Sequence, residues 1–260
     1  MSELIGTTAF VTGAGQGVGE AIARRLVEAG AKRITIAARR TDALQRVATD
    51  LRGQGADVLV QQLDLESVNS IRTAAAAAES AFGQVDILVN SAGVTDRGDL
   101  FSTEPETFDR VFGTNVRGNF FLMQAIAKGM VRRRSGVIIN ISSMLAHGGM
   151  PHLLPYSASK AALNLITRNV AHALRRDRVR AHAINLGWTV TPAEHQTQTQ
   201  VHAMPQDWAE AEGAKQPFGR LLIADDPAGL AVFLASRDAE MMTGTVIDLE
   251  QWVSGVLSVD

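Results

Sequence analysis

Residues 7–19 read TTAFVTGAGQGVG, and this stretch decides the fold. Residues 7–12 form a β-prone run, the glycine-rich part follows, and a helical pattern over residues 20–29 closes at Gly30. Glycines between a strand and a helix let the backbone approach a pyrophosphate, whose charge the N-terminus of the helix stabilises. Glycines that serve only a tight turn are the alternative, but the flanking strand and helix favour a phosphate loop.

The same alternation of strand and helix continues along most of the chain. Further strands are expected over residues 33–38, 57–63, 85–90, 137–141, 179–185 and 245–249. Helices are expected over 41–51, 67–82, 156–176 and 226–236, and after a capping box at Thr103 and Glu106, with Thr41 and Ser67 as N-caps. The pattern predicts an α/β fold, a parallel sheet with helices on both faces, in one domain over residues 1–260. The rhythm breaks after Pro192, so we expect a substrate lid at about 190–218.

Composition excludes several classes of protein. The 260 residues include no Cys, which excludes a disulfide scaffold, a thiolate metal site and a Cys nucleophile, and fits a cytoplasmic location. The net charge of −2 offers no general attraction for nucleic acid or anionic membrane. No run of 18 strongly apolar residues suggests a membrane span. We expect a small-molecule substrate, with neither nucleic acid nor membrane as partner.

Several motifs in a fixed order resemble those of the short-chain dehydrogenase/reductase family, over nearly the whole chain. TGAGQGVG resembles its cofactor loop, and the segment Tyr156-Ser-Ala-Ser-Lys160 its catalytic YxxxK motif. The resemblance implies a Rossmann-type, doubly wound, seven-stranded sheet of order 3-2-1-4-5-6-7, an NAD(P)-dependent oxidoreductase and a site at the carboxyl ends of the strands. The family's catalytic set corresponds to Asn115, Ser143, Tyr156 and Lys160. Its cofactor-binding positions correspond to Gly13, Gln16, Gly17, Val18, Gly19, Arg39, Arg40, Asp64, Leu65, Asn90, Ala92, Gly93, Tyr156, Lys160, Gly187, Thr189 and Thr191.

Tyr156 is the only tyrosine of the chain, and one of its four lysines follows four residues later. On a helix this spacing puts both side chains on one face. A phenol has a pKa near 10, and a decrease of about three units needs about 4 kcal/mol of preference for the phenolate. One ammonium at about 4 Å and an effective dielectric near 20 supplies about that much. We therefore expect Lys160 to lower the pKa of Tyr156, which exchanges the proton of the alcohol. A helix-anchoring Tyr with an unrelated Lys is the alternative.

Two further polar residues lie where the reaction needs them. Ser143 comes 13 residues before Tyr156 at the end of an expected strand, where its hydroxyl can polarise a substrate carbonyl; two serines that merely close a strand are the alternative. Asn115 interrupts an apolar helical stripe, and its family counterpart holds a water that links the Lys to solvent. A polar contact between helices would explain Asn115 as well.

The cofactor preference depends on the end of the second strand. Where an NAD site places an acid, this chain has Ala38, followed by Arg39 and Arg40. Guanidinium groups suit a 2′-phosphate, so we predict NADP(H) in preference to NAD(H). The neutral Gln16, where many NADP-using relatives carry a basic residue, and a purely solvated role for the two arginines weigh against this.

Substrate, metal and assembly complete the expectations. Four histidines near the site (His147, His152, His195 and His202) lack the spacing of a metal set, so no metal is expected.

The polar lid favours a polyol, sugar or sugar acid, interconverted as secondary alcohol and ketone. A 3-oxoacyl thioester reductase and a non-catalytic dinucleotide-binding sensor or scaffold are the alternatives. Apolar stripes on two long helices (residues 112–123 and 163–174) favour a homo-oligomer, a tetramer or a dimer, although packing on the sheet explains them as well.

Overall fold

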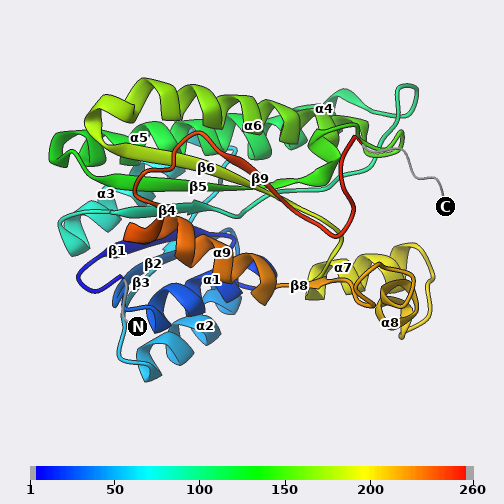
Figure 1. Cartoon of the computed structure of the whole chain (residues 1–260), viewed down its shortest axis with the longest axis horizontal. Coiled ribbons are helices and arrows are strands. Elements are labelled where there is room, and N and C mark those ends of the chain that lie inside the picture. Colours follow the sequence, from blue (N-terminus) through cyan, green and yellow to red (C-terminus); the bar gives the residue numbers. More distant parts are fainter. Residues whose placement is uncertain (1–3, 256–260) are drawn as a thin grey trace.

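The computed structural model describes residues 4–255, and a seven-stranded parallel sheet forms its centre (Figure 1). The strand order is β3-β2-β1-β4-β5-β6-β9, which confirms the expected order, with β9 as the seventh strand. In that order the strands are Asp57–Gln62, Arg33–Ala38, Thr8–Thr12, Ile87–Asn90, Gly136–Ser143, Val179–Leu186 and Val246–Leu249. The order reverses between β1 and β4, and in such sheets the ligand binds at that switch point. The predicted domain includes residues 1–3 and 256–260, which lie outside the described part.

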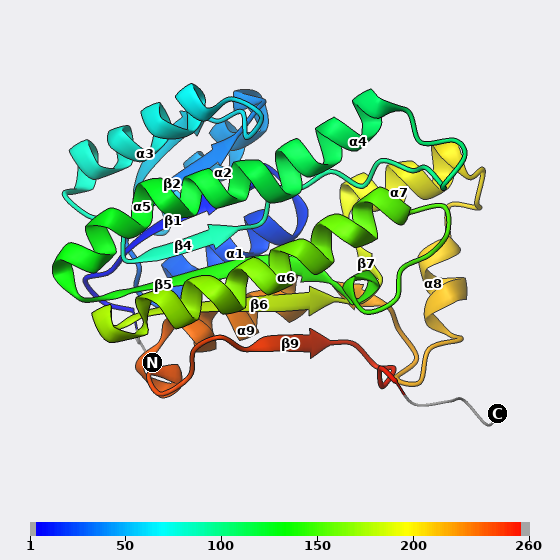
Figure 2. The ribbon, with the colours of Figure 1, turned by 90° about the horizontal axis from the view of Figure 1, so that it is seen from above.

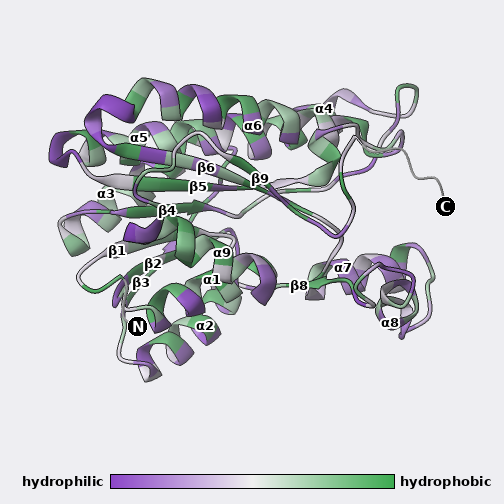
Figure 3. Cartoon of the chain, viewed as in Figure 1, coloured by the Kyte–Doolittle hydropathy of each residue, from purple (hydrophilic) through white to green (hydrophobic). Residues whose placement is uncertain are grey.

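Helices cover both faces of this sheet, as Figures 1 and 2 show. One face carries α1 (Gly17–Glu28), α2 (Thr41–Gly53) and α9 (Asp225–Ala235). The other carries α3 (Val68–Phe82), α5 (Asn119–Arg133) and α6 (Leu154–Leu174). Each face has its own apolar cluster, so inner strands such as β1 and β4 are buried on both sides and read as apolar runs, whereas the edge strands β3 and β9 are partly exposed. The inner strands are mostly green in Figure 3.

The helix ends agree only in part with the expected caps. The hydroxyl of Ser67 accepts a hydrogen bond from a backbone N–H at 3.2 Å and caps α3 as predicted. Thr41 is instead the first residue of α2, not its cap. The capping box at Thr103 and Glu106 is wrong, because the Thr103 hydroxyl donates to the carbonyl of Asp99 at 2.6 Å and α4 (Pro105–Phe112) starts one residue later than a Thr103 cap would place it.

A π-helical turn, Gly113–Gly118, joins α4 to α5 and carries Asn115. Such a turn widens the helix and frees backbone groups from the regular ladder. The Asn119 amide donates to the Asn115 carbonyl at 2.9 Å and satisfies one of them. The asparagines on the otherwise apolar stripe are thus explained in part by the backbone of this turn.

The segment after β6 projects from the end of the sheet (Figure 2). It contains β7 (Thr189–Val190), α7 (Pro192–Gln196), α8 (Trp208–Gly213) and β8 (Leu222–Ile223). The two short strands form a second parallel sheet, which the sequence did not predict. Trp208 is 1% exposed and anchors the segment by apolar burial. None of the described helices has the length and apolarity that crossing a membrane requires.

Candidate active site

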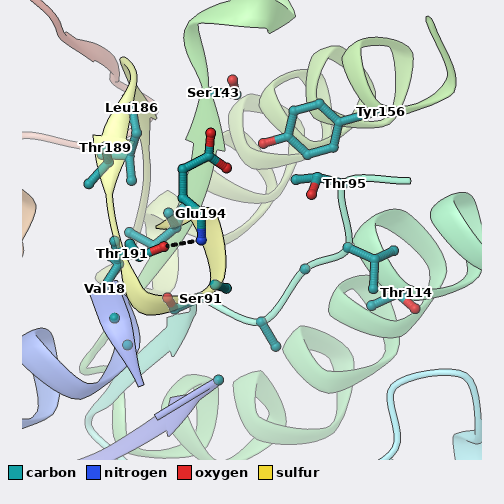
Figure 4. Close-up of a pocket in the computed structure, with 18 of the residues that line it drawn as sticks. Val18, Ser91, Thr95, Thr114, Ser143, Tyr156, Leu186, Thr189, Thr191 and Glu194 are labelled. Carbon is teal, nitrogen blue, oxygen red and sulfur yellow. Dashed lines mark hydrogen bonds between the residues drawn. The ribbon is translucent and has the colours of Figure 1, made fainter. Parts of the chain in front are cut away.

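A cavity of about 790 Å³ opens at the carboxyl ends of the central strands. Its walls come from the segments that follow β1, β2, β3, β4, β5, β6 and β9, together with Thr114 of the π-helical turn. Figure 4 shows side chains from several of these segments converging on one space. The sheet therefore places the site where its strand order reverses, as expected for this topology.

Three glycines shape the loop between β1 and α1. Gly13 has φ +67°, and a Cβ there would lie 2.9 Å from the backbone nitrogen of Ala92. A Cβ on Gly19 would lie 2.5 Å from the Gly13 carbonyl oxygen, and one on Gly17, at φ +60°, 3.2 Å from Thr191 Cγ2. At Gly13 and Gly19 a larger residue would require a shift of backbone, and at Gly17 it would adopt a strained positive φ and press on the Thr191 side chain. The first residues of α1 line the cavity. The loop thus has the form of a cradle for a pyrophosphate.

Most of the predicted cofactor-binding residues line this cavity. Those at its wall are Gly13, Gln16, Gly17, Val18, Gly19, Arg39, Arg40, Asp64, Leu65, Ala92, Gly93, Tyr156, Lys160, Gly187, Thr189 and Thr191. Both arginines are exposed, and neither forms an ion pair within the described part of the chain. The polar groups at this wall and the glycine cradle fit a nicotinamide dinucleotide.

Asn90 and Asn115 are fully buried and do not line the cavity. Asn90 donates to the side-chain oxygen of Asn140 at 2.7 Å, within the core. The Asn115 amide donates to the Val94 carbonyl and to Ser159 Oγ, and its oxygen accepts from the Val94 N–H at 2.9 Å. The Asn115 side chain therefore joins its own helix to α6 and to the loop after β4.

Ser143, Tyr156 and Lys160 come together at the end of β5 and the start of α6. Ser143 is the last residue of its strand, and Figure 4 shows its hydroxyl and that of Tyr156 facing the same space. The ammonium of Lys160 donates to the Ile141 carbonyl at 2.8 Å and lies 5.6 Å from the centre of the Tyr156 ring. The three residues thus lie together at one wall of the cavity.

The pKa of Tyr156 is raised in the structure, whereas we expected Lys160 to lower it. Burial raises the pKa of Tyr156 to about 12, and the charge of Glu194 acts in the same direction, while a hydrogen bond with Ser143 lowers it. Burial also lowers the pKa of Lys160 to about 8. Desolvation of the phenolate, which the Coulomb argument left out, is the largest influence on the pKa of Tyr156.

Comparison with known proteins agrees with this geometry. A family model described as short chain dehydrogenase matches residues 7–202. The chain belongs to the short-chain dehydrogenases. It is 32% identical to galactitol 2-dehydrogenase of Agrobacterium fabrum, over 95% of this chain and 97% of that protein. It is also 32% identical to sorbitol dehydrogenase of Cereibacter sphaeroides, over 96% and 99% of the two chains. A solved structure of a variant actinorhodin polyketide ketoreductase with NADPH superposes with a TM-score of 0.90 at 28% identity, covering 96% of this chain and 98% of that one.

Among the charged groups at the cavity wall of this short-chain dehydrogenase that sequence reasoning missed is Glu194. Glu194, on α7, lines the cavity, and Figure 4 shows its carboxylate pointing toward the hydroxyls of Ser143 and Tyr156. The Thr191 hydroxyl accepts from the Glu194 N–H at 3.1 Å, so the two residues have the spacing of a helix cap. That spacing could have revealed the helix, but no sequence signal gives the direction of the carboxylate.

The two histidines of the loop between Ser143 and Tyr156 differ in position. His152 lines the cavity. His147 is outside it and bonds the carboxylate of Asp248 on β9 at 2.8 Å. Within residues 4–255 no group of three His, Asp or Glu side chains could hold a metal ion.

Gly187, which follows β6, lies directly against the side chain of Glu250. A Cβ at this position would lie 1.9 Å from a carboxylate oxygen of Glu250, which follows β9. Glu250 also lines the cavity, so the segment after β9 belongs to the site wall of this short-chain dehydrogenase.

Proposed function

We propose that this short-chain dehydrogenase interconverts a secondary alcohol and a ketone, with NADP(H) as hydride carrier and a polyol or sugar as substrate. The observation that carries the proposal is the convergence of Ser143, Tyr156 and Lys160 on the cavity beside the glycine cradle. The names of the galactitol and sorbitol dehydrogenases support the substrate class. The exposed Arg39 and Arg40, with Ala38 in place of an acid, support NADP(H) over NAD(H).

The nicotinamide group, when bound, supplies or accepts a hydride at the reacting carbon. The Ser143 hydroxyl donates a hydrogen bond to the substrate oxygen and stabilises the negative charge that develops there. The Tyr156 hydroxyl gives its proton to that oxygen during reduction and takes it back during oxidation. Lys160, held on the Ile141 carbonyl, stabilises the phenolate through its charge. Asn115 acts at a distance, by fixing the loop after β4 against α6.

Replacing Tyr156 tests the reaction. Wild type and Tyr156→Phe are assayed with NADP⁺ and a panel of polyols and sugars, and with NADPH and ketones. Loss of the proton donor should lower kcat by about 10²- to 10⁴-fold. NADPH binding, followed by its fluorescence, should stay within a few fold. Unchanged turnover of a substrate by the variant contradicts the proposal.

The cofactor preference has a separate test. In an Arg39→Ala, Arg40→Ala double variant the Kd for NADPH should rise at least about tenfold, since hydrogen bonds to charged groups contribute about 1.5–3 kcal/mol each. The Kd for NADH should change little, because it lacks the 2′-phosphate. Equal affinity of the wild type for NADPH and NADH would contradict the proposed preference for NADP(H).

A 3-oxoacyl thioester is the second candidate substrate. The superposition with a polyketide ketoreductase supports it, and so do the apolar residues Leu145, Met150 and Leu153 at the cavity wall. NADPH oxidation with an acetoacetyl thioester, compared with sugars and ketones, separates the two candidates.

We also propose a homo-oligomer that uses the face formed by α4, α5 and α6. Phe108, Phe120 and Leu165 are 42%, 40% and 62% exposed on these helices. Apolar side chains that gather on an outer helix face are typical of subunit contacts. Light scattering should give a dimer or tetramer, and Leu165→Glu should dissociate it.

A further inference from the structure

The carboxylate of Glu194 enters the cavity from the segment after β6 rather than from the sheet. Figure 4 shows it directed toward the hydroxyl groups of Ser143 and Tyr156, which are the proposed reacting groups. Its negative charge raises the pKa of Tyr156, so the two groups are close enough to interact. A substrate oxygen held between Ser143 and Tyr156 would therefore have the rest of its molecule beside this carboxylate.

The two carboxylate oxygens of Glu194 differ in their hydrogen bonds within the protein. The indole N–H of Trp188 donates to Oε1 at 2.8 Å, and the buried amide of Gln198 donates to the same atom at 2.7 Å. Among the described residues no hydrogen bond reaches Oε2. Oε2 is consequently an acceptor of fixed position within the cavity.

Stacking in turn holds the residues that support Glu194. The rings of Trp188 and Trp208 stack at a distance of 5.3 Å between centroids. Trp208 is 1% exposed, and its indole N–H donates to His195 Nδ1 at 3.1 Å. The contacts within this cluster therefore fix the orientation of the Glu194 side chain.

No described basic residue forms an ion pair with Glu194, so its charge remains available to the cavity. The other charged or titratable side chains outside the reacting set at the cavity wall are Arg39, Arg40, Asp64, Arg97, His152 and Glu250. An unpaired carboxylate accepts a hydrogen bond from a neutral hydroxyl and repels a second carboxylate.

We propose that Glu194 determines substrate specificity: its free oxygen accepts a hydrogen bond from a hydroxyl near the reacting carbon of a neutral polyol, and its charge rejects a sugar acid. This inference rests on the proposed alcohol–ketone reaction. It narrows the substrates that the sequence left open, because sugar acids are excluded while polyols and neutral sugars remain.

The test compares neutral polyols with the corresponding acids. Sorbitol and galactitol, with gluconate and galactonate, are assayed with NADP⁺ in wild type, Glu194→Gln and Glu194→Asp. Glu210→Gln is the matched control, since Glu210 is an exposed carboxylate on α8 that does not line the cavity. Melting temperature and NADPH binding are measured for every variant, so that a folding defect is recognised.

Glu194→Gln replaces the free acceptor by an amide that can donate. Its kcat/KM for the polyols should fall about 10- to 100-fold, while that for the acids rises, because a charged hydrogen bond is lost and a repulsion is removed. Glu194→Asp keeps the charge but moves the acceptor oxygen away from the substrate. The kcat/KM for the polyols should therefore fall, and the acids should still not be used as substrates. Glu210→Gln should match the wild type.

The outcomes separate the inference from the reaction on which it rests. If wild type uses sugar acids as well as polyols, or if Glu194→Gln leaves the ratio of the two within about twofold, the inference is overturned and the proposed reaction stands. A strong preference for an amino polyol such as glucamine over sorbitol overturns it too, because a cation is then the partner. If wild type turns over none of the alcohols, ketones or thioesters, the proposed reaction itself is wrong and the inference falls with it.

Discussion

The buried ammonium of Lys160 should make the stability of the protein depend on pH in a way that one substitution removes. Lys160 is 5% exposed, and burial lowers its pKa from 10.5 to about 8. The folded chain therefore loses this proton at lower pH than the unfolded chain. Below pH 8 both states carry the charge and burial destabilises the fold; as the pH rises from about 8 toward 10.5, that destabilisation disappears.

The size of the effect follows from the two pKa values. The gap between 10.5 and about 8, at about 1.36 kcal/mol per pH unit, corresponds to ~3 kcal/mol over the full range. Between pH 7 and pH 9.5 about 2 kcal/mol of it should appear. The limit at pH 9.5 avoids ionisation of the unfolded tyrosine, whose pKa is near 10.

Lys160→Met removes the titrating group and keeps a side chain of similar length. Urea unfolding of wild type and variant at a series of pH values and one protein concentration gives the free energy of unfolding of each. The wild type should gain about 2 kcal/mol relative to the variant between pH 7 and pH 9.5. Curves that stay parallel over this range would falsify the argument, since Lys160 would then titrate alike in both states. The variant should also lose turnover if Lys160 stabilises the phenolate.

Three further substitutions test other parts of the structure. Ser143→Ala should lower kcat about 10²- to 10³-fold and leave the NADPH affinity close to that of the wild type, as steady-state kinetics and fluorescence titration can measure. Asn140→Ala leaves the buried Asn90 amide without its acceptor, so the free energy of unfolding should fall by ~2–4 kcal/mol in urea denaturation. Gly13→Ala puts a Cβ 2.9 Å from a backbone nitrogen at φ +67°, and should lower both the melting temperature and, about tenfold or more, the NADPH affinity; binding as tight as in the wild type would contradict the cradle.

The regular elements were predictable because each has one dominant physical signal. Residues 33–38 were expected as a strand and form β2 with the same bounds, since a strand buried on both faces reads as an apolar run. The strand before Ser143 extends two residues further than expected, to include Ser143 itself. The strand order came from the family resemblance, because alternation of strand and helix alone does not specify which strands are neighbours.

Local competition between hydrogen bonds was less predictable. Thr103 has the spacing of a capping box, yet its hydroxyl is bound by the Asp99 carbonyl of the preceding loop. The sequence also did not indicate that the partners of the Asn115 side chain would be the loop after β4 and Ser159. Asp99 and Val94 lie in irregular backbone, where no periodicity indicates which groups will meet.

The proposed chemistry and the proposed substrate choice lie in different kinds of structure. Ser143, Tyr156 and Lys160 lie on β5 and α6, which the sheet holds in place, and the family motifs pointed to them in the sequence. Glu194 lies on a five-residue helix that the stacked Trp188 holds in orientation, in a segment with no periodicity to read. Because that segment is separate from β5 and α6, we expect substitutions in it to alter which alcohol is accepted while the geometry of the tyrosine stays the same. The motif residues Ser143, Tyr156 and Lys160 would therefore stay the same when the substrate specificity changes.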